Sequence, residues 1–221
     1  MRPAENVISY VLWGEDPRYH APLQENLRIK DHLFPSWTIP VYVDRSMPEN
    51  LRKALQQAGA QVIVKEQPPG QPPARRLVWR YDVLAEPGIK RYLIRDADSL
   101  LTVKERVAVD DWLRSGKHFH VMRDFRTHTD LVLAGLWGGV GGILPAPAKL
   151  WENFKPWRME NDHVDQDLLT VTVWPTLRQS CLIHDSVFTG CLGSVPFPPY
   201  GELPPRHHVG QNAFIHFQQG K

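Results

Sequence analysis

Short apolar segments alternate with amphipathic segments through the first half of the chain. The apolar runs at positions 7–13 (VISYVLW), 38–43, 61–64 and 91–95 are predicted to be strands. Glycine, proline or charged residues stand at the ends of these runs. Helices are predicted between them, where leucines or other apolar residues recur near helical spacing, at 21–33, 48–58 and 76–85. This β-α-β-α-β order predicts a parallel sheet with helices packed on its faces.

The pattern becomes less regular in the second half. A helix at 104–113 and a strand at 118–122 are followed by a glycine cluster at 135–142 (GLWGGVGG). The remaining predicted elements are a helix at 164–173 and strands at 181–184 and 213–217. We therefore expect one α/β domain over residues 1–221, with a nucleotide-binding half at 1–116 and a half at 117–221 whose loops hold an acceptor and a sugar.

Composition narrows the class of protein. The chain has 221 residues and a net charge of +2, which gives no support for a nucleic-acid partner. No apolar run approaches the ~20 residues needed to span a bilayer, and the N-terminal residues lack a secretory pattern. The two cysteines, Cys181 and Cys191, form no metal or redox motif. We expect a cytoplasmic protein with reduced cysteines and no membrane span.

Two aspartates follow the apolar run at 91–95. Side chains alternate along a strand, so Asp96 and Asp98 project to the same side. They stand at the carboxyl end of the strand, the edge at which open α/β sheets bind ligands. Two such carboxylates repel each other unless a cation or proton intervenes, and oxygen ligands favour Mg²⁺ or Mn²⁺. The alternative is that they cap the next helix or lie in solvent.

The same aspartates have a second interpretation. A strand ending in D-A-D-S-L also resembles the haloacid-dehalogenase phosphatases, in which Asp96 would be the nucleophile and Asp98 the general acid. That motif normally follows the first strand of its domain, whereas three strand–helix units precede it here. No later acidic pair at a strand end supplies the metal site of that family.

Two later motifs bear on the choice. In HVDQDLL, Asp165 and Gln166 are about 100° apart on a helix, so one can face a site while the other supports it. Carboxylates at a helix start are also stabilised by the helix dipole, whatever their function. In AFIHFQQGK, alternation places His216 at the end of a short strand, where it is a metal ligand or an ordinary surface histidine.

Together these motifs resemble the GT-A glycosyltransferases, and most of all the retaining family of glycogenin and the bacterial lipopolysaccharide galactosyltransferases. That family shows, in order, A-R-L, a strand into D-x-D, D-Q-D on a helix and a late H-F-x-G-x-x-K. The corresponding segments of this chain are 74–77, 96–98, 165–167 and 216–221.

The resemblance implies a GT-A fold and an activity. A sugar would move from a nucleoside-diphosphate sugar, with a UDP-sugar as the expected donor, to a carbohydrate or other hydroxyl acceptor. Asp98 and His216 would hold Mn²⁺ or Mg²⁺, which would stabilise the charge on the leaving diphosphate. Asp96 would either ligate the same ion or bind the ribose hydroxyls of the donor. A non-catalytic GT-A-like module that binds a nucleotide or carbohydrate is the further alternative.

The resemblance also suggests roles for other side chains. The catalytic group would be Asp165, Gln166 and Asp167, facing the sugar. The donor would be bound by Leu12, Trp13 and Gly14 at its base and ribose, and by Arg76, Arg80 and Lys221 at its phosphates, because guanidinium and ammonium groups suit phosphate oxygens. Trp137, with Gly138 and Gly139, would offer the sugar an aromatic platform and a close backbone approach, unless the cluster is a tight turn around a core tryptophan.

Overall fold

The computed structural model describes residues 6–71, 73–152, 154, 163–201 and 207–213. Within these residues the chain forms a seven-stranded sheet of order β3-β2-β1-β4-β6-β5-β7. Every neighbouring pair is parallel except those of β6, which runs antiparallel to both β4 and β5. The strands are β1 (Asn6–Leu12), β2 (Pro40–Asp44), β3 (Gln61–Lys65), β4 (Arg91–Arg95), β5 (Phe119–Arg123), β6 (Leu136–Val140) and β7 (Cys181–Asp185).

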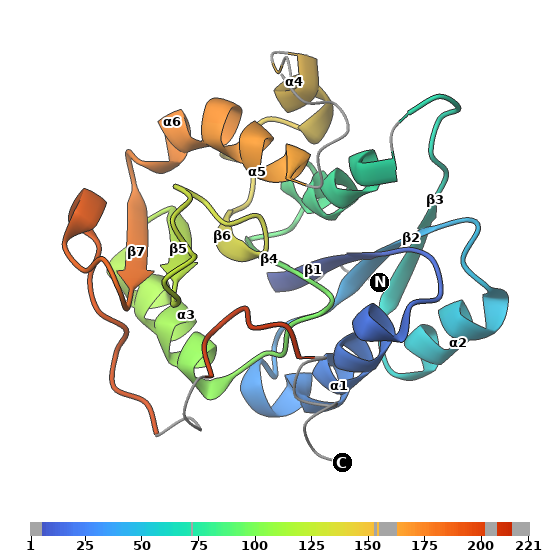
Figure 1. Cartoon of the computed structure of the whole chain (residues 1–221), viewed down its shortest axis with the longest axis horizontal. Helices are drawn as coiled ribbons and strands as arrows, with labels where there is room; N and C mark the ends of the chain where they lie inside the picture. Colours follow the sequence, from blue (N-terminus) through green and yellow to red (C-terminus); the bar gives the residue numbers. More distant parts are fainter. Residues whose placement is uncertain (1–5, 72, 153, 155–162, 202–206, 214–221) are drawn as a thin grey trace.

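Helices lie on both sides of this sheet (Figure 1). One group comprises α1 (Pro17–Leu33), α2 (Glu49–Gln57) and α3 (Val103–Ser115). The other comprises the 3₁₀ segment η1 (Pro73–Leu84), α4 (Pro147–Glu152), α5 (Val164–Leu168), the π-helical turn η2 (Leu169–Val173) and α6 (Trp174–Leu177). A short 3₁₀ turn, η3 (Cys191–Gly193), follows β7.

The first strand shows why two cores form. Alternate residues of β1 point to opposite faces, so Val7 and Val11 join one apolar cluster while Ile8 and Tyr10 join another. The first cluster includes η1 and the helices after α4, and the second includes α1 and α3. Burial of both faces explains why the strand reads as an uninterrupted apolar run rather than as an alternating one.

The helix boundaries follow local signals. Asp16 caps α1 by accepting a hydrogen bond from the Arg18 backbone N–H at 2.9 Å, and a proline occupies the first helical position. Thr102 caps α3 in the same way, accepting from the Glu105 N–H at 3.1 Å. The helix ends at Gly116, whose φ of 70° is readily adopted by glycine.

The structure corrects the interpretation of the glycine cluster. Residues 136–140 form β6, a central strand that the sequence pattern did not predict. Gly138 and Gly139 are glycines because an added Cβ would lie 2.5 Å from the Tyr92 carbonyl oxygen and 2.4 Å from the Tyr92 hydroxyl, respectively. Trp137 is 0 % exposed and packs edge-on against Tyr81 and Tyr92. Its ring therefore belongs to the core and offers no platform to a sugar.

Other predictions have mixed outcomes. The strand at 91–95 is confirmed with its bounds, whereas the predicted helix at 76–85 is a 3₁₀ segment that begins earlier, and α4 was not predicted. The predicted strand at 213–217 lies outside the described residues except for Ala213. Cys181 and Cys191 are both free thiols. Among the described helices, none has the length and apolar character needed to cross a membrane.

Candidate functional site

The two aspartates of the D-x-D motif stand just past the end of β4, between β1 and β6 in the sheet. The Asp96 side chain is 48 % exposed. Burial raises the pKa of Asp98 to about 6, and the negative charge of Asp96 adds to this shift. The two carboxylates are thus close enough to repel each other, as the sequence predicts.

A buried arginine connects this motif to the D-Q-D helix. Arg80, on η1, is 2 % exposed, and one of its terminal nitrogens pairs with Asp96. The other lies 2.6 Å from the Asp165 carboxylate on α5, whose side chain is 4 % exposed. Burial raises the pKa of Asp165, and the positive charge of Arg80 opposes that rise. Three segments that are distant in sequence therefore meet at one guanidinium.

The position of Arg80 overturns its predicted role at the donor phosphates. Its Nη1 also donates to the Arg95 carbonyl oxygen at 3.2 Å, so the described residues engage both of its terminal nitrogens. Its own carbonyl oxygen accepts a hydrogen bond from the Ser9 hydroxyl at 2.7 Å, which fixes η1 against β1. Arg80 orients Asp96 and Asp165, and it is not available to a phosphate.

The donor set fits a divalent cation in part. Asp96 and Asp165 together carry two negative charges against the single charge of Arg80, and Asp98 adds a further carboxylate beside them. The chain also leaves room for the Asp96 carboxylate, since a Cβ on Gly135 would lie 1.9 Å from its Oδ2. The described residues contain no cluster of three or more metal-ligating side chains. Of the predicted ligands, Asp96 and Asp98 lie within the described residues, whereas His216 lies outside them together with Lys221.

The D-Q-D residues point in different directions. Asp165 faces the buried Arg80, and its Oδ1 accepts from the Gln166 backbone N–H at 2.9 Å. The Gln166 side chain instead donates to Asp130 at 3.0 Å, near the surface. Asp167 is partly exposed on the same turn. Asp130, in the segment between β5 and β6, was not predicted, because nothing in its local sequence distinguishes it from an ordinary surface acid.

The predicted base and ribose residues lie at the end of β1, next to β4. Leu12 is buried, and Trp13 packs against the core with part of its ring exposed. Gly14 has a φ of 70°, and its carbonyl oxygen bonds to His20 Nε2 at 3.0 Å. Arg76 lies farther along the sheet edge, where its Nε donates to Asp44 at the end of β2 at 2.7 Å. That contact uses Nε alone, so it does not engage the terminal nitrogens of Arg76 that a phosphate would meet.

Two residues at the start of α1 were missed by the sequence interpretation. Tyr19 has a pKa raised by burial and then by the negative charge of Asp98. The pKa of Arg18 is raised mainly by Asp16, which lies 2.6 Å away, and also by the negative charge of Asp98. The signal that could have found them is topological: β1 and β4 are parallel neighbours, so the start of α1, which follows β1, lies at the same edge of the sheet as the residues that follow β4.

Comparison with known proteins places this arrangement in a structural class. The fold resembles that of a glycosyltransferase involved in the glycosylation of the major capsid of PBCV-1, with a TM-score of 0.53, 12 % identity and coverage of 81 % of each chain. The chain has the GT-A fold. The low identity means that this similarity establishes the GT-A fold alone. No protein-family model and no curated protein sequence matches the chain.

Two further solved structures align more distantly. One is the mannosyltransferase PcManGT from Pyrobaculum calidifontis in complex with GDP-Man and Mn²⁺, with a TM-score of 0.46 and 15 % identity over 85 % of this chain; the aligned part spans 56 % of that protein. The other is a putative nucleotide-diphospho-sugar transferase from Desulfovibrio desulfuricans G20, with a TM-score of 0.48, 11 % identity and coverage of 82 % of this chain and 80 % of that one.

Proposed function

We propose that this chain is a metal-dependent glycosyltransferase that moves a sugar from a nucleoside-diphosphate sugar to a hydroxyl acceptor. The observation that carries the proposal is the meeting of two motifs at one sheet edge. Asp96 and Asp98 follow the central strand β4 of a GT-A sheet, and Arg80 joins Asp96 to Asp165 of the D-Q-D helix. A donor diphosphate at the first motif would place its sugar near the second.

Each side chain then has a distinct task. Asp96 and Asp98 would hold a cation, Mn²⁺ or Mg²⁺, which when bound supplies positive charge to the leaving diphosphate. Arg80 fixes the carboxylates of Asp96 and Asp165 before any ligand arrives, so little reorganisation is needed on binding. The Gln166 side chain, held by Asp130 near the surface, would face the sugar of the donor. The family resemblance also suggests retention of the anomeric configuration, which an NMR assay of the anomeric proton of the product would test.

The phosphatase alternative receives no support from the fold. It required the D-x-D motif to follow the first strand of its domain, whereas the motif follows β4 within a GT-A sheet. Robust hydrolysis of a phosphomonoester that depends on Asp96 would restore that alternative.

The proposed function is tested by thermal unfolding with a panel of UDP- and GDP-sugars, with and without Mn²⁺. A ligand at 100 times its Kd stabilises the native state by about 2.7 kcal/mol. We expect one donor to stabilise the parent protein in a Mn²⁺-dependent manner, and Asp98→Ala to abolish the effect. Asp31→Ala is the control, since the Asp31 side chain is 74 % exposed on α1.

Two outcomes contradict the proposal in different ways. Equal stabilisation of the parent and of Asp98→Ala removes the metal assignment. Stabilisation that depends on Asp98, without any transfer or slow hydrolysis of the sugar from the donor, identifies a binding module instead of an enzyme.

A further inference from the structure

Residues 207–213, which we call the strap, cross the carboxyl ends of β5 and β4. At one end the Val209 N–H donates to the Asp124 carboxylate, just after β5, at 2.8 Å. At the other end the Ala213 N–H donates to the Asp98 carbonyl oxygen at 2.7 Å, and the neighbouring Asn212 pairs with Ser99 in an antiparallel bridge. In Figure 1 the strap is the red segment that passes between α1 and α3.

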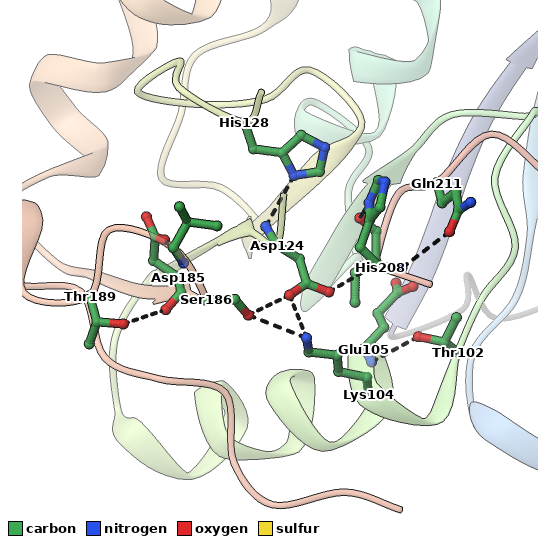
Figure 2. A network of polar contacts seen from close by, with 12 residues as sticks. Thr102, Lys104, Glu105, Asp124, His128, Asp185, Ser186, Thr189, His208 and Gln211 are labelled. Atoms are coloured by element: carbon green, nitrogen blue, oxygen red, sulfur yellow. Dashed lines mark hydrogen bonds and ion pairs between the residues drawn. The ribbon is translucent and has the colours of Figure 1, made fainter. Parts of the chain in front are cut away.

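A buried ion pair anchors the start of the strap (Figure 2). The Asp124 side chain is 1 % exposed, and its Oδ1 pairs with Lys104 of α3 and accepts from the Ser186 hydroxyl. Its Oδ2 accepts from Val209 of the strap. A carboxylate with partners from three separate elements is fixed in position, and it fixes the strap in turn. His208 adds a stacked contact with Phe125, with ring centroids 4.4 Å apart.

The strap delivers a primary amide to the candidate cation site. Asn212 Nδ2 lies 2.9 Å from Asp98 Oδ2, so a neutral hydrogen-bond donor faces this carboxylate. An asparagine amide carries a donor and an acceptor on one carbon, and rotation about the Cβ–Cγ bond exchanges them. Amide oxygens are good ligands for the hard divalent cations that carboxylates bind. The same side chain can therefore donate a hydrogen bond to Asp98 or, after rotation, offer an oxygen ligand to a cation beside it.

We propose that Asn212 is a ligand of the cation held by Asp98, with its amide turned so that Oδ1 replaces Nδ2 at the site. The inference rests on the proposed function, because it takes the cation at Asp96 and Asp98 as given. It assigns a role to a residue that none of the sequence motifs includes. The strap is then part of the donor site, and Asp124 acts through it as a positioning residue.

The test measures Mn²⁺ binding directly, by the loss of the free aquo-ion signal in electron paramagnetic resonance, with and without UDP. Asn212→Ala should raise the Kd for Mn²⁺ about tenfold, which corresponds to about 1.4 kcal/mol. Asn212→Asp should lower that Kd below the parent value, because a carboxylate supplies a charged oxygen ligand. The same variant should unfold at a lower temperature without metal, since two carboxylates then face each other, and should recover when Mn²⁺ is added.

The two variants separate a ligand from a mere hydrogen-bond donor. If Asn212 only ties the strap to Asp98, both substitutions remove that bond, and both should weaken Mn²⁺ binding; this result overturns the inference. An unchanged Kd in Asn212→Ala overturns it as well. Gln211→Ala is the matched control on the same segment, because the Gln211 side chain bonds to the His208 N–H rather than to Asp98, and its Kd should equal that of the parent.

The Asp98→Ala variant keeps the two proposals distinguishable. Loss of Mn²⁺ binding in Asp98→Ala combined with parent-like binding in Asn212→Ala leaves the proposed function in place and removes Asn212 from the site. Parent-like binding in Asp98→Ala, or a parent protein that takes up no Mn²⁺, removes the cation site itself and the inference with it.

Discussion

Replacement of Arg80 by methionine tests the buried connection between the two acidic motifs. Methionine fills much of the same volume, but it removes the guanidinium that pairs with Asp165, whose side chain is 4 % exposed. Removing one partner of a buried ion pair typically costs about 3–5 kcal/mol, because an uncompensated charge remains inside the protein. A typical domain has only about 5–15 kcal/mol of stability, so this variant should be close to the limit of folding.

The measurement is urea denaturation followed by fluorescence of the eight tryptophans. The added substitution Asp165→Asn removes the stranded charge, so the double variant should be more stable than Arg80→Met alone. The deficit of the single variant should also shrink as the pH is lowered. A buried acid with a raised pKa binds a proton more readily in the folded than in the unfolded state. The folded protein therefore loses stability as the pH rises and regains it as the pH falls.

An exposed ion pair provides the comparison. Arg28 is 69 % exposed and lies 2.6 Å from Glu25 on the surface of α1, where such pairs contribute about 0–1 kcal/mol. Arg28→Met should therefore leave the denaturation midpoint almost unchanged. If Arg80→Met is no more destabilising than Arg28→Met, or if Asp165→Asn fails to relieve it, the described connection does not hold the site together.

Two further predictions concern packing and pH. Gly135→Ala should displace the Asp96 carboxylate and weaken Mn²⁺-dependent donor binding, whereas Gly201→Ala, which meets no atom within 4 Å, should not; equal binding by both variants contradicts the packing argument. His120 and His184 are joined by a hydrogen bond of 2.9 Å, and burial lowers the pKa of both. As the pH falls, the unfolded chain therefore binds protons at these histidines before the folded chain does. The stability of the folded state should consequently decrease as the pH drops below about 6.5. Urea midpoints measured between pH 7.5 and 5 check this, and a His120→Phe variant should show a shallower decline; an identical slope would count against it.

The sequence predicts the parallel half of the sheet well because each strand there is a local apolar run between breakers. It fails at β6, where Gly138 and Gly139 have low strand propensity and no side chains to pack. That strand exists because the backbones of β4 and β5 flank it and because Tyr92 fills the space that side chains would take. Such a cause is tertiary, and a local pattern cannot contain it.

The candidate site divides in the same way. The position of Asp96 and Asp98 follows from the alternation of side chains along a strand and from the tendency of open α/β sheets to bind ligands at the carboxyl ends of their strands. Both can be read from the local sequence. The role of Arg80 cannot, because its partner Asp165 is 85 positions away and only the packing of α5 on η1 brings them together. An arginine near two acidic motifs suggests phosphate binding by its chemistry, and only its burial shows that it serves the acids instead.

The route of the strap also orders events during synthesis. Asn212 is 114 residues beyond Asp98, and a ribosome adds about 5–20 residues per second, so the amide is made on the order of ten seconds after the carboxylate that it meets. Until the strap is made, Asp98 lacks its Asn212 partner and Asp124 lacks its Val209 partner. A nascent chain can therefore hold most of its sheet before Asn212 reaches Asp98, so the proposed cation site is completed later than the sheet that carries it.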